Sequence, residues 1–113
     1  MKPVDGKDEM FLFFRFLPDL VEIDMSHNKI VTVSNRAFAS QSKVKSLKLD
    51  GNKIGQINNQ TLFGLSKMTA LSFKKNQIEI LPAQLFRYAK RVQDLDFGKN
   101  RISQIDALAF EGK

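Results

Sequence analysis

Few residues of this chain could carry out chemistry on a substrate. It contains one histidine, His27, and no cysteine among its 113 residues. The missing thiols exclude a disulfide scaffold, a cysteine nucleophile and a Cys-ligated zinc site, and a lone histidine excludes a site with two or more His ligands. Asp94 and Asp96 would share one face of a strand, but no third oxygen donor follows from the spacing. The sequence therefore predicts neither a metal site nor a cofactor.

The other motifs of catalysis do not appear either. Residues 51–55 (GNKIG) lack the Walker spacing of a phosphate-binding loop. Beyond scattered serines and His27, no nucleophile–base pair is available. We expect a protein that is not an enzyme.

A strict internal repeat organises the chain. One asparagine recurs every 24 residues, at Asn28, Asn52, Asn76 and Asn100. Large apolar residues recur with it, at 8, 5 and 3 positions before each asparagine and at 2, 5 and 10 positions after it. A period of this kind predicts stacked coils of a single repeat domain, comprising residues 20–43 (coil 1), 44–67 (coil 2), 68–91 (coil 3) and 92–113 (coil 4).

Each coil contains an apolar–polar–apolar triplet, such as Ile23-Asp24-Met25, whose alternation predicts a short strand. One such strand cannot bury its apolar face alone, whereas strands stacked in register form a parallel sheet. The recurring asparagine falls where the strand bends, and its amide can satisfy backbone groups that the bend leaves unpaired. The return segments are expected to be extended or to form short helical turns.

The two ends can be interpreted with the same period. Phe14 lies 24 residues before Phe38, so residues 1–19 are interpreted as a partial leading repeat that ends the core. The apolar run Met10–Leu17 then covers that end, and a signal peptide is the alternative interpretation. The run is too short for a membrane span of about 20 residues. Coil 4 is interpreted as truncated and uncapped, which would expose parts of Val92, Leu95, Phe97, Ile102, Ile105 and Phe110.

The pattern L-x-x-L-x-L-x-x-N-x-I-x-x-L-x-x-x-x-F resembles a leucine-rich repeat. Its 24-residue period is similar to the class of extracellular Toll-like receptors, small proteoglycans and axon-guidance proteins, and the resemblance spans about Phe11 to Gly112. It implies an α/β fold, a right-handed solenoid with a parallel β-sheet on the concave face and mostly loop and short helical turns on the convex face. Cys-rich caps usual in secreted members are missing, which suggests a fragment of a larger ectodomain or a small unusual member.

The resemblance also implies a function, namely noncatalytic recognition of a protein ligand by an extracellular receptor, immune or adhesion-type protein. An extracellular or cell-surface location follows from it, with a cytoplasmic one left open. Family members most often bind partners on the concave face, so the predicted contacts are its outward side chains: Glu22, Asp24, Lys48, Asp50, Ser72, Lys74, Asp94 and Asp96. This face measures roughly 250 Å², against about 800 Å² per partner in a stable interface.

The basic charge of the chain lies away from that face. The chain has 18 Lys and Arg against 12 Asp and Glu, a net charge of +6, while the outward strand positions are acidic overall. A candidate polyanion-binding rim follows the asparagines, at Lys29, Lys53, Lys75, Lys99 and Arg101. The alternative is a solvated rim that keeps the solenoid soluble. Nucleic acid is disfavoured because the aromatic residues occupy core columns.

Two further candidate sites remain. The uncapped end, represented by Phe97, Ile102 and Phe110, could bind a second copy and produce a homo-oligomer. The triplet Asn59-Gln60-Thr61 is an N-glycosylation sequon on the return side, so Asn59 is a candidate glycosylation site.

Overall fold

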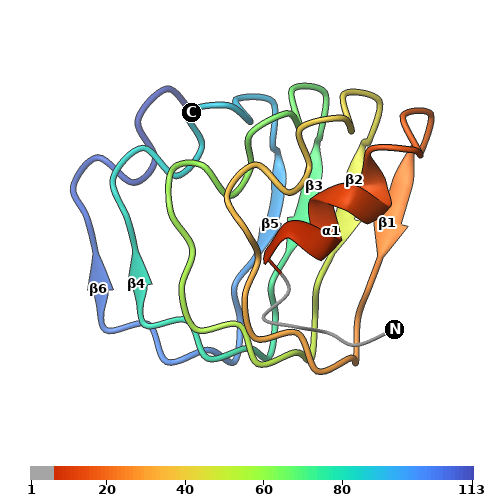
Figure 1. Cartoon of the computed structure of the whole chain (residues 1–113). Coiled ribbons are helices and arrows are strands. Elements are labelled where there is room, and N and C mark those ends of the chain that lie inside the picture. Colours follow the sequence, from red (N-terminus) through yellow and green to blue (C-terminus); the bar gives the residue numbers. More distant parts are fainter. Residues whose placement is uncertain (1–6) are drawn as a thin grey trace.

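The computed structural model describes residues 7–113, which form a solenoid of stacked coils (Figure 1). The predicted leading segment starts at residue 1, so its first part, residues 1–6, lies outside the described residues. The elements in chain order are helix α1 (Lys7–Phe14) and strands β1 (Glu22–Asp24), β2 (Ser46–Lys48), β3 (Ala70–Ser72), β4 (Ile80–Leu81), β5 (Asp94–Asp96) and β6 (Gln104–Ile105).

Four strands form the parallel sheet that the repeat predicts. Their order is β1-β2-β3-β5, and each pairing joins residues 24 positions apart, as Ile23 with Leu47 and Leu71 with Leu95. Because a slip of one residue would turn every central leucine or isoleucine to the solvent, the constant register keeps the apolar column inside. The predicted solenoid with a parallel sheet is confirmed.

The opposite side of the solenoid consists mainly of turns, as predicted. Turns occupy residues 35–40, 59–64, 83–88 and 107–112. Within them, N–H groups donate to the carbonyl three residues earlier, for example Ala37 to Ser34 and Arg87 to Gln84. The structure adds a second sheet that was not predicted, in which β4 and β6 pair in parallel ahead of the last two turns.

The core is a column of apolar side chains between the sheet and the turns. Phe38, Phe73 and Phe86 are at most 1% exposed. Phe73 stacks on Phe97 with ring centroids 5.6 Å apart, and Phe86 stacks on Phe110 at 5.5 Å. Each buried phenylalanine stabilises the fold by about 2–3 kcal/mol through apolar burial. The core thus runs continuously from one coil to the next.

The asparagines form a hydrogen-bonded ladder along one edge of this core. The amide of Asn76 donates to the carbonyl of Phe73 in its own coil and to that of Leu49 in the preceding coil, both at 2.9 Å. Its Oδ1 accepts the N–H of Ile54 at 3.1 Å. Asn52 and Asn100 repeat this pattern one coil earlier and one coil later. Each ladder asparagine therefore ties two neighbouring coils together through backbone groups.

The residue before each ladder asparagine has a left-handed backbone. Its φ is 59° at His27, 68° at Gly51, 59° at Lys75 and 56° at Lys99. Only glycine adopts this conformation freely, and other residues lose about 1–2 kcal/mol there. Gly51 also gives room to the imidazole of His27, because a Cβ at residue 51 would lie 3.0 Å from the His27 Cε1 atom.

The leading segment packs on coil 1. Phe14 is 2% exposed, and its ring centroid lies 5.4 Å from that of Phe38. The buried side-chain amide of Gln41 donates to the carbonyls of Phe14 at 2.7 Å and Leu17 at 3.2 Å. These contacts hold the segment against the core, while Phe16 is 71% exposed.

Candidate recognition surfaces

The predicted contact residues lie on one sheet in three rows. The register places Glu22 and Asp94 in the first row and Asp24, Lys48, Ser72 and Asp96 in the second. Asp50 and Lys74 follow two residues after the second row on their coils. The strands thus bring all eight predicted residues to the same face.

Backbone groups fix several of the acidic side chains of this face. Asp24 Oδ1 accepts the N–H of Ser26 at 3.0 Å, and Asp96 Oδ1 accepts the N–H of Gly98 at 2.7 Å. The Ser26 hydroxyl and N–H hold the pKa of Asp24 below its usual value, and Lys48 adds a smaller Coulombic contribution. Asp24 and Asp96 therefore support the bends of their own chain as well as facing the solvent.

Asp50 links two coils in the middle of the sheet. Its Oδ1 accepts a hydrogen bond from the Ser72 hydroxyl and another from the N–H of Lys74, the latter at 3.1 Å. These bonds join coil 2 to coil 3. Of the predicted contact residues, Asp50, Ser72 and Lys74 are half-buried and the other five are exposed.

A shallow hollow occupies the centre of the face. Its volume is about 350 Å³. Its lining includes the predicted residues Lys48, Asp50, Ser72, Lys74, Asp94 and Asp96. Glu22 and Asp24 lie on the same sheet but outside this hollow. The hollow therefore combines two lysines with three carboxylates, which suits a ligand that carries both signs of charge.

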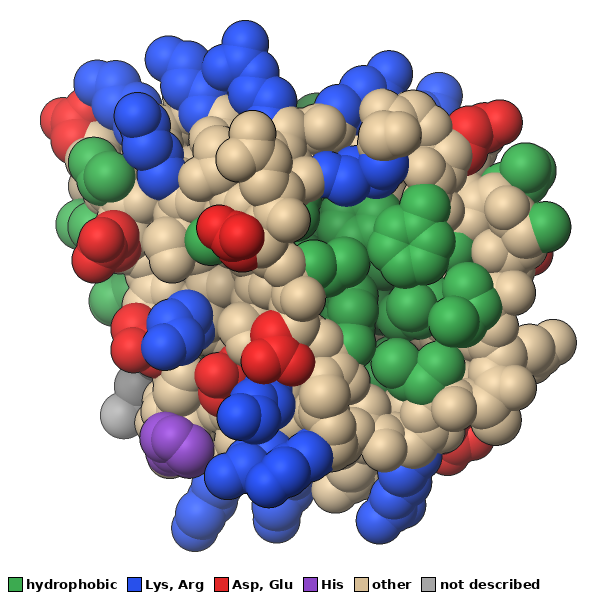
Figure 2. Space-filling view, turned by 180° about the vertical axis from the view of Figure 1, so that it is seen from behind, with side chains coloured by type: hydrophobic (Ala, Val, Ile, Leu, Met, Phe, Trp, Pro, Cys, Tyr) green, Lys and Arg blue, Asp and Glu red, His purple; other side chains and the backbone are tan. Residues whose placement is uncertain are grey.

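The predicted basic rim is exposed along its whole length. Lys29, Lys53, Lys75, Lys99 and Arg101 all reach the solvent. Figure 2 shows lysine and arginine side chains gathered along the edge beside the single histidine. The structure thus brings the five residues of the rim together on one edge of the solenoid.

The last coil presents an apolar surface, visible as a continuous hydrophobic area in Figure 2. Leu95, Ile105, Leu108 and Phe110 are between 36% and 57% exposed. Phe97 and Ile102, two of the residues predicted for this end, are half-buried, and Leu108 was not predicted because its column is otherwise polar.

The sequence-based expectation for Val92 was wrong. Its side chain is 3% exposed and belongs to the core cluster. Val92 precedes β5 and occupies the same apolar column as Val44 and Met68, both fully buried. The column position therefore faces the interior even in the last described coil.

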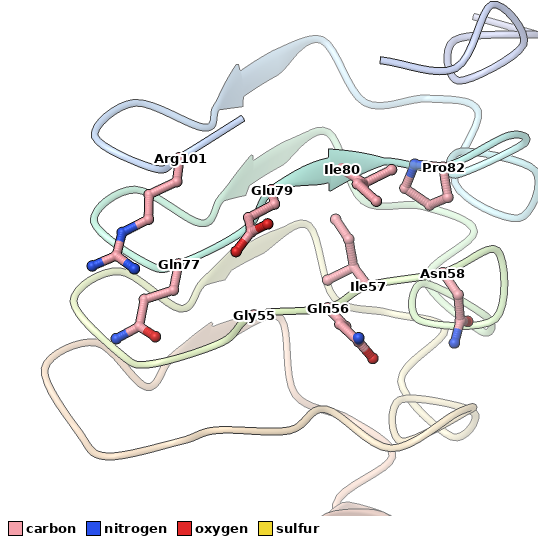
Figure 3. Close-up of a pocket in the computed structure, with 9 residues that line it drawn as sticks. All are labelled: Gly55, Gln56, Ile57, Asn58, Gln77, Glu79, Ile80, Pro82 and Arg101. Carbon is pink, nitrogen blue, oxygen red and sulfur yellow. The ribbon is translucent and has the colours of Figure 1, made fainter. Parts of the chain in front are cut away.

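A pocket that the sequence did not reveal lies on the flank between coils 2 and 3. It has a volume of about 500 Å³. Figure 3 shows Gln77 and Arg101 at one end of the pocket and Asn58 and Pro82 at the other. Gly55 contributes no side chain, whereas the equivalent positions in the other coils carry valine, glutamate and serine. This difference is the sequence feature that could have indicated the pocket.

The glycosylation sequon lies in a convex turn. Asn59 is half-buried, and its Oδ1 accepts a hydrogen bond from the Gln60 side chain at 3.3 Å. Thr61 is 1% exposed, and its hydroxyl oxygen accepts the N–H of Asn58 at 2.8 Å. Glycosylation of Asn59 stays a prediction.

Among the residues that the structure describes, no three His, Asp or Glu side chains come together as metal ligands would. Within residues 7–113, no helix has the length and apolar composition needed to cross a bilayer.

Comparison with known proteins gives a family match and a structural match. A model of the leucine rich repeat matches residues 11–54 and 42–102. A search of curated proteins gives no match. The crystal structure of a TLR13–ssRNA13 complex matches with 26% sequence identity and a TM-score of 0.83. The match covers 88% of this chain and 14% of the TLR13 chain, so this chain spans only a small part of that protein's length.

Proposed function

The chain belongs to the leucine-rich repeat family, and we propose that it is a noncatalytic recognition module that binds a protein ligand through the concave sheet face. The observation that carries the proposal is the fixed placement of charged side chains on that face. They project from strands in a constant register, and backbone N–H groups hold Asp24, Asp50 and Asp96. Side chains that are ordered before binding lose little entropy when the ligand arrives.

The charge of the face indicates the chemistry of the ligand. Glu22, Asp24, Asp94 and Asp96 are exposed acids, whereas Lys48 is the exposed base among the predicted contacts. A ligand with a basic patch would complement this arrangement and would be steered to it. The TLR13 structure contains single-stranded RNA, but phosphates would meet repulsion from these four carboxylates. A basic protein surface therefore suits the face better than RNA does.

The likeness to a Toll-like receptor supports an extracellular receptor or immune role for the module. The sheet face alone, at roughly 250 Å², is smaller than the surface that a stable partner usually needs. We therefore propose a contact that extends from the strands onto the bends that follow them, where Asp50 and Lys74 lie.

The test compares two variants of identical composition. Glu22→Lys with Asp94→Lys reverses two of the four exposed acids of the face, and Glu79→Lys with Asp19→Lys makes the same changes elsewhere. Asp19 pairs with Lys43 at 2.7 Å on an exposed surface, so its loss costs little stability. Each immobilised variant is probed with an arrayed library of secreted proteins. Ligands of the wild type should be retained by the control and lost by the face variant, and equal retention by both would refute the proposal.

A second candidate function is self-association through the apolar side of coil 4. The exposed Leu95, Ile105, Leu108 and Phe110 favour it, because a surface of this kind gains from burial against a second copy. Ile105→Glu at this end and Val31→Glu in coil 1 introduce the same charge at side chains that are 57% and 61% exposed. Sedimentation should show a concentration-dependent dimer that only Ile105→Glu abolishes, and a wild-type monomer at high micromolar concentration would rule it out.

A further inference from the structure

The basic rim is a second surface, separate from the concave face. Every coil contributes at least one cation to it: Lys29 from coil 1, Lys53 from coil 2, Lys75 from coil 3, and Lys99 and Arg101 from coil 4. Parallel strands are about 4.8 Å apart, so three steps from coil 1 to coil 4 extend the rim over ~14 Å. The five charges therefore follow one edge of the solenoid in two adjacent columns, with Lys29, Lys53 and Arg101 directly after the asparagines and Lys75 and Lys99 directly before them.

The backbone beneath the rim is rigid. The N–H of Lys53 donates to Ile30 at 2.8 Å, and the N–H of Arg101 donates to Ile78 at 3.0 Å. The ladder asparagines lie immediately before these two residues and bond to the neighbouring coil. Since the backbone at these points is hydrogen-bonded from coil to coil, the spacing of the Cα atoms that carry the cations is set before any ligand binds.

No acid of the described residues forms an ion pair with a rim cation, although Glu79 lines the same pocket as Arg101. The ion pair within 4 Å that the described residues form joins Lys43 to Asp19, neither of which belongs to the rim. Asp24 and Asp96, carboxylates on the adjacent strands, accept backbone N–H groups of their own bends. Like charges along one edge repel one another, and a bound anion would relieve that repulsion.

Lys75 and Lys99 lie at the left-handed bend that precedes the ladder asparagine. Both residues hold the left-handed conformation that Gly51 adopts without strain in coil 2. Lysine at such a position costs about 1–2 kcal/mol compared with glycine. His27 shares this conformation in coil 1, so the bend requires it in every coil, and in coils 3 and 4 it places a lysine directly beside the ladder asparagine.

We propose that the rim binds a linear sulfated glycan. Sulfates and carboxylates repeat along such a chain and can be bound by charge and hydrogen bonds alone. A single-stranded nucleic acid would also need aromatic platforms for its bases. The exposed phenylalanines of the described chain are Phe13 and Phe16 in the leading segment and Phe110 in the last turn, away from the rim. The rim therefore fits the sulfated chain better.

The test removes charge without disturbing the fold. The variant Lys29→Gln/Lys53→Gln/Arg101→Gln places glutamine where coil 3 already has Gln77, in the same column. A control, Lys67→Gln/Lys90→Gln/Arg91→Gln, removes two lysines and one arginine from exposed positions on the return side. Each variant loses three positive charges from the net +6 and keeps +3. Any difference between the two variants therefore reports the position of the charges and not their number.

The measurement is affinity for a fluorescent heparin hexasaccharide as a function of NaCl, with oligo-dT of equal charge as a second probe. The rim variant should bind heparin about tenfold or more weakly than the control, and its dependence on salt should be shallower by about three counterions. Heparin should also bind more tightly than oligo-dT. Equal losses in both triple variants, no wild-type binding at low salt, or equal affinity for oligo-dT would each overturn the proposal.

Discussion

Replacing Asn76 by alanine tests the inter-coil ladder directly. Asn76 is 5% exposed, so water cannot replace its hydrogen bonds. The N–H of Ile54 loses its 3.1 Å acceptor and stays buried, at a cost of about 1–3 kcal/mol. The carbonyls of Leu49 and Phe73 each lose one 2.9 Å donor. They keep the amide of a neighbouring ladder asparagine, so each loses about 0.5–1 kcal/mol. The free energy of unfolding should therefore fall by about 2–5 kcal/mol.

Asn28→Ala is the matched control from the same column. Asn28 is exposed, and its amide donates to the carbonyl of Met25 at 2.9 Å, a carbonyl that also accepts the Asn52 amide. Water can take over the remaining bonds, so the loss should not exceed about 1 kcal/mol. The two substitutions remove the same atoms, and only the burial and the number of bonded coils differ.

Urea unfolding followed by circular dichroism measures both losses. The dependence on urea should keep its slope if the coils unfold together. A decrease in slope for Asn76→Ala would indicate that coils 1 and 2 separate from coils 3 and 4 before global unfolding. Equal losses for the two variants, or a loss below about 1 kcal/mol for Asn76→Ala, would refute the assignment of stability to the buried ladder.

Four other substitutions test the backbone and the acidic face. Gly64→Ala should destabilise the chain by about 3 kcal/mol or more, because φ is +100° and a Cβ would lie within 2.7 Å of the preceding coil's backbone. In Gly55→Ala, the nearest atom to the new Cβ is 3.9 Å away. This variant should therefore change stability by less than about 1 kcal/mol in thermal unfolding. Lys75→Gly relieves about 1–2 kcal/mol of left-handed strain, and the larger backbone entropy that glycine loses on folding offsets about 0.5–1 kcal/mol of it. The urea midpoint should therefore rise by the equivalent of about 0.5–1 kcal/mol, and no increase would contradict the strain argument. Because its folded pKa is lowered, Asp24 contributes stability above its unfolded pKa of about 3.9, and this stability is lost as pH falls through the folded pKa. The difference in free energy of unfolding between wild type and Asp24→Asn, measured in urea, should therefore shrink from pH 7 to pH 2. A constant difference would disprove this role of Asp24.

The repeat made most of the fold predictable. Ile23, Leu47, Leu71 and Leu95 recur at the central strand position, and the strands pair through these residues. Along each strand these apolar residues alternate with polar ones, which defines the buried face of the sheet and the register in which the strands pair. The second sheet could not be predicted, because the extended backbone at Ile80 and Gln104 carries no alternation that distinguishes it from a loop.

The candidate sites were predictable only as positions. The period places Asp50 on the sheet face, but the sequence does not show that Ser72 and Lys74 donate hydrogen bonds to it. Such bonds depend on side-chain rotamers across two coils. The flank pocket was missed for a related reason. It arises from an absent side chain at Gly55, and a glycine in a return segment usually indicates only a turn.

The ladder bonds join each coil only to its immediate neighbours, which has a mechanical consequence. Tension applied to the two ends of the chain would load the hydrogen bonds between one pair of coils at a time. Once those bonds break, the released coil would free about 24 residues. At about 3.4 Å per residue this length corresponds to ~80 Å of contour. A stretched molecule should therefore lengthen in near-equal increments, one coil at a time.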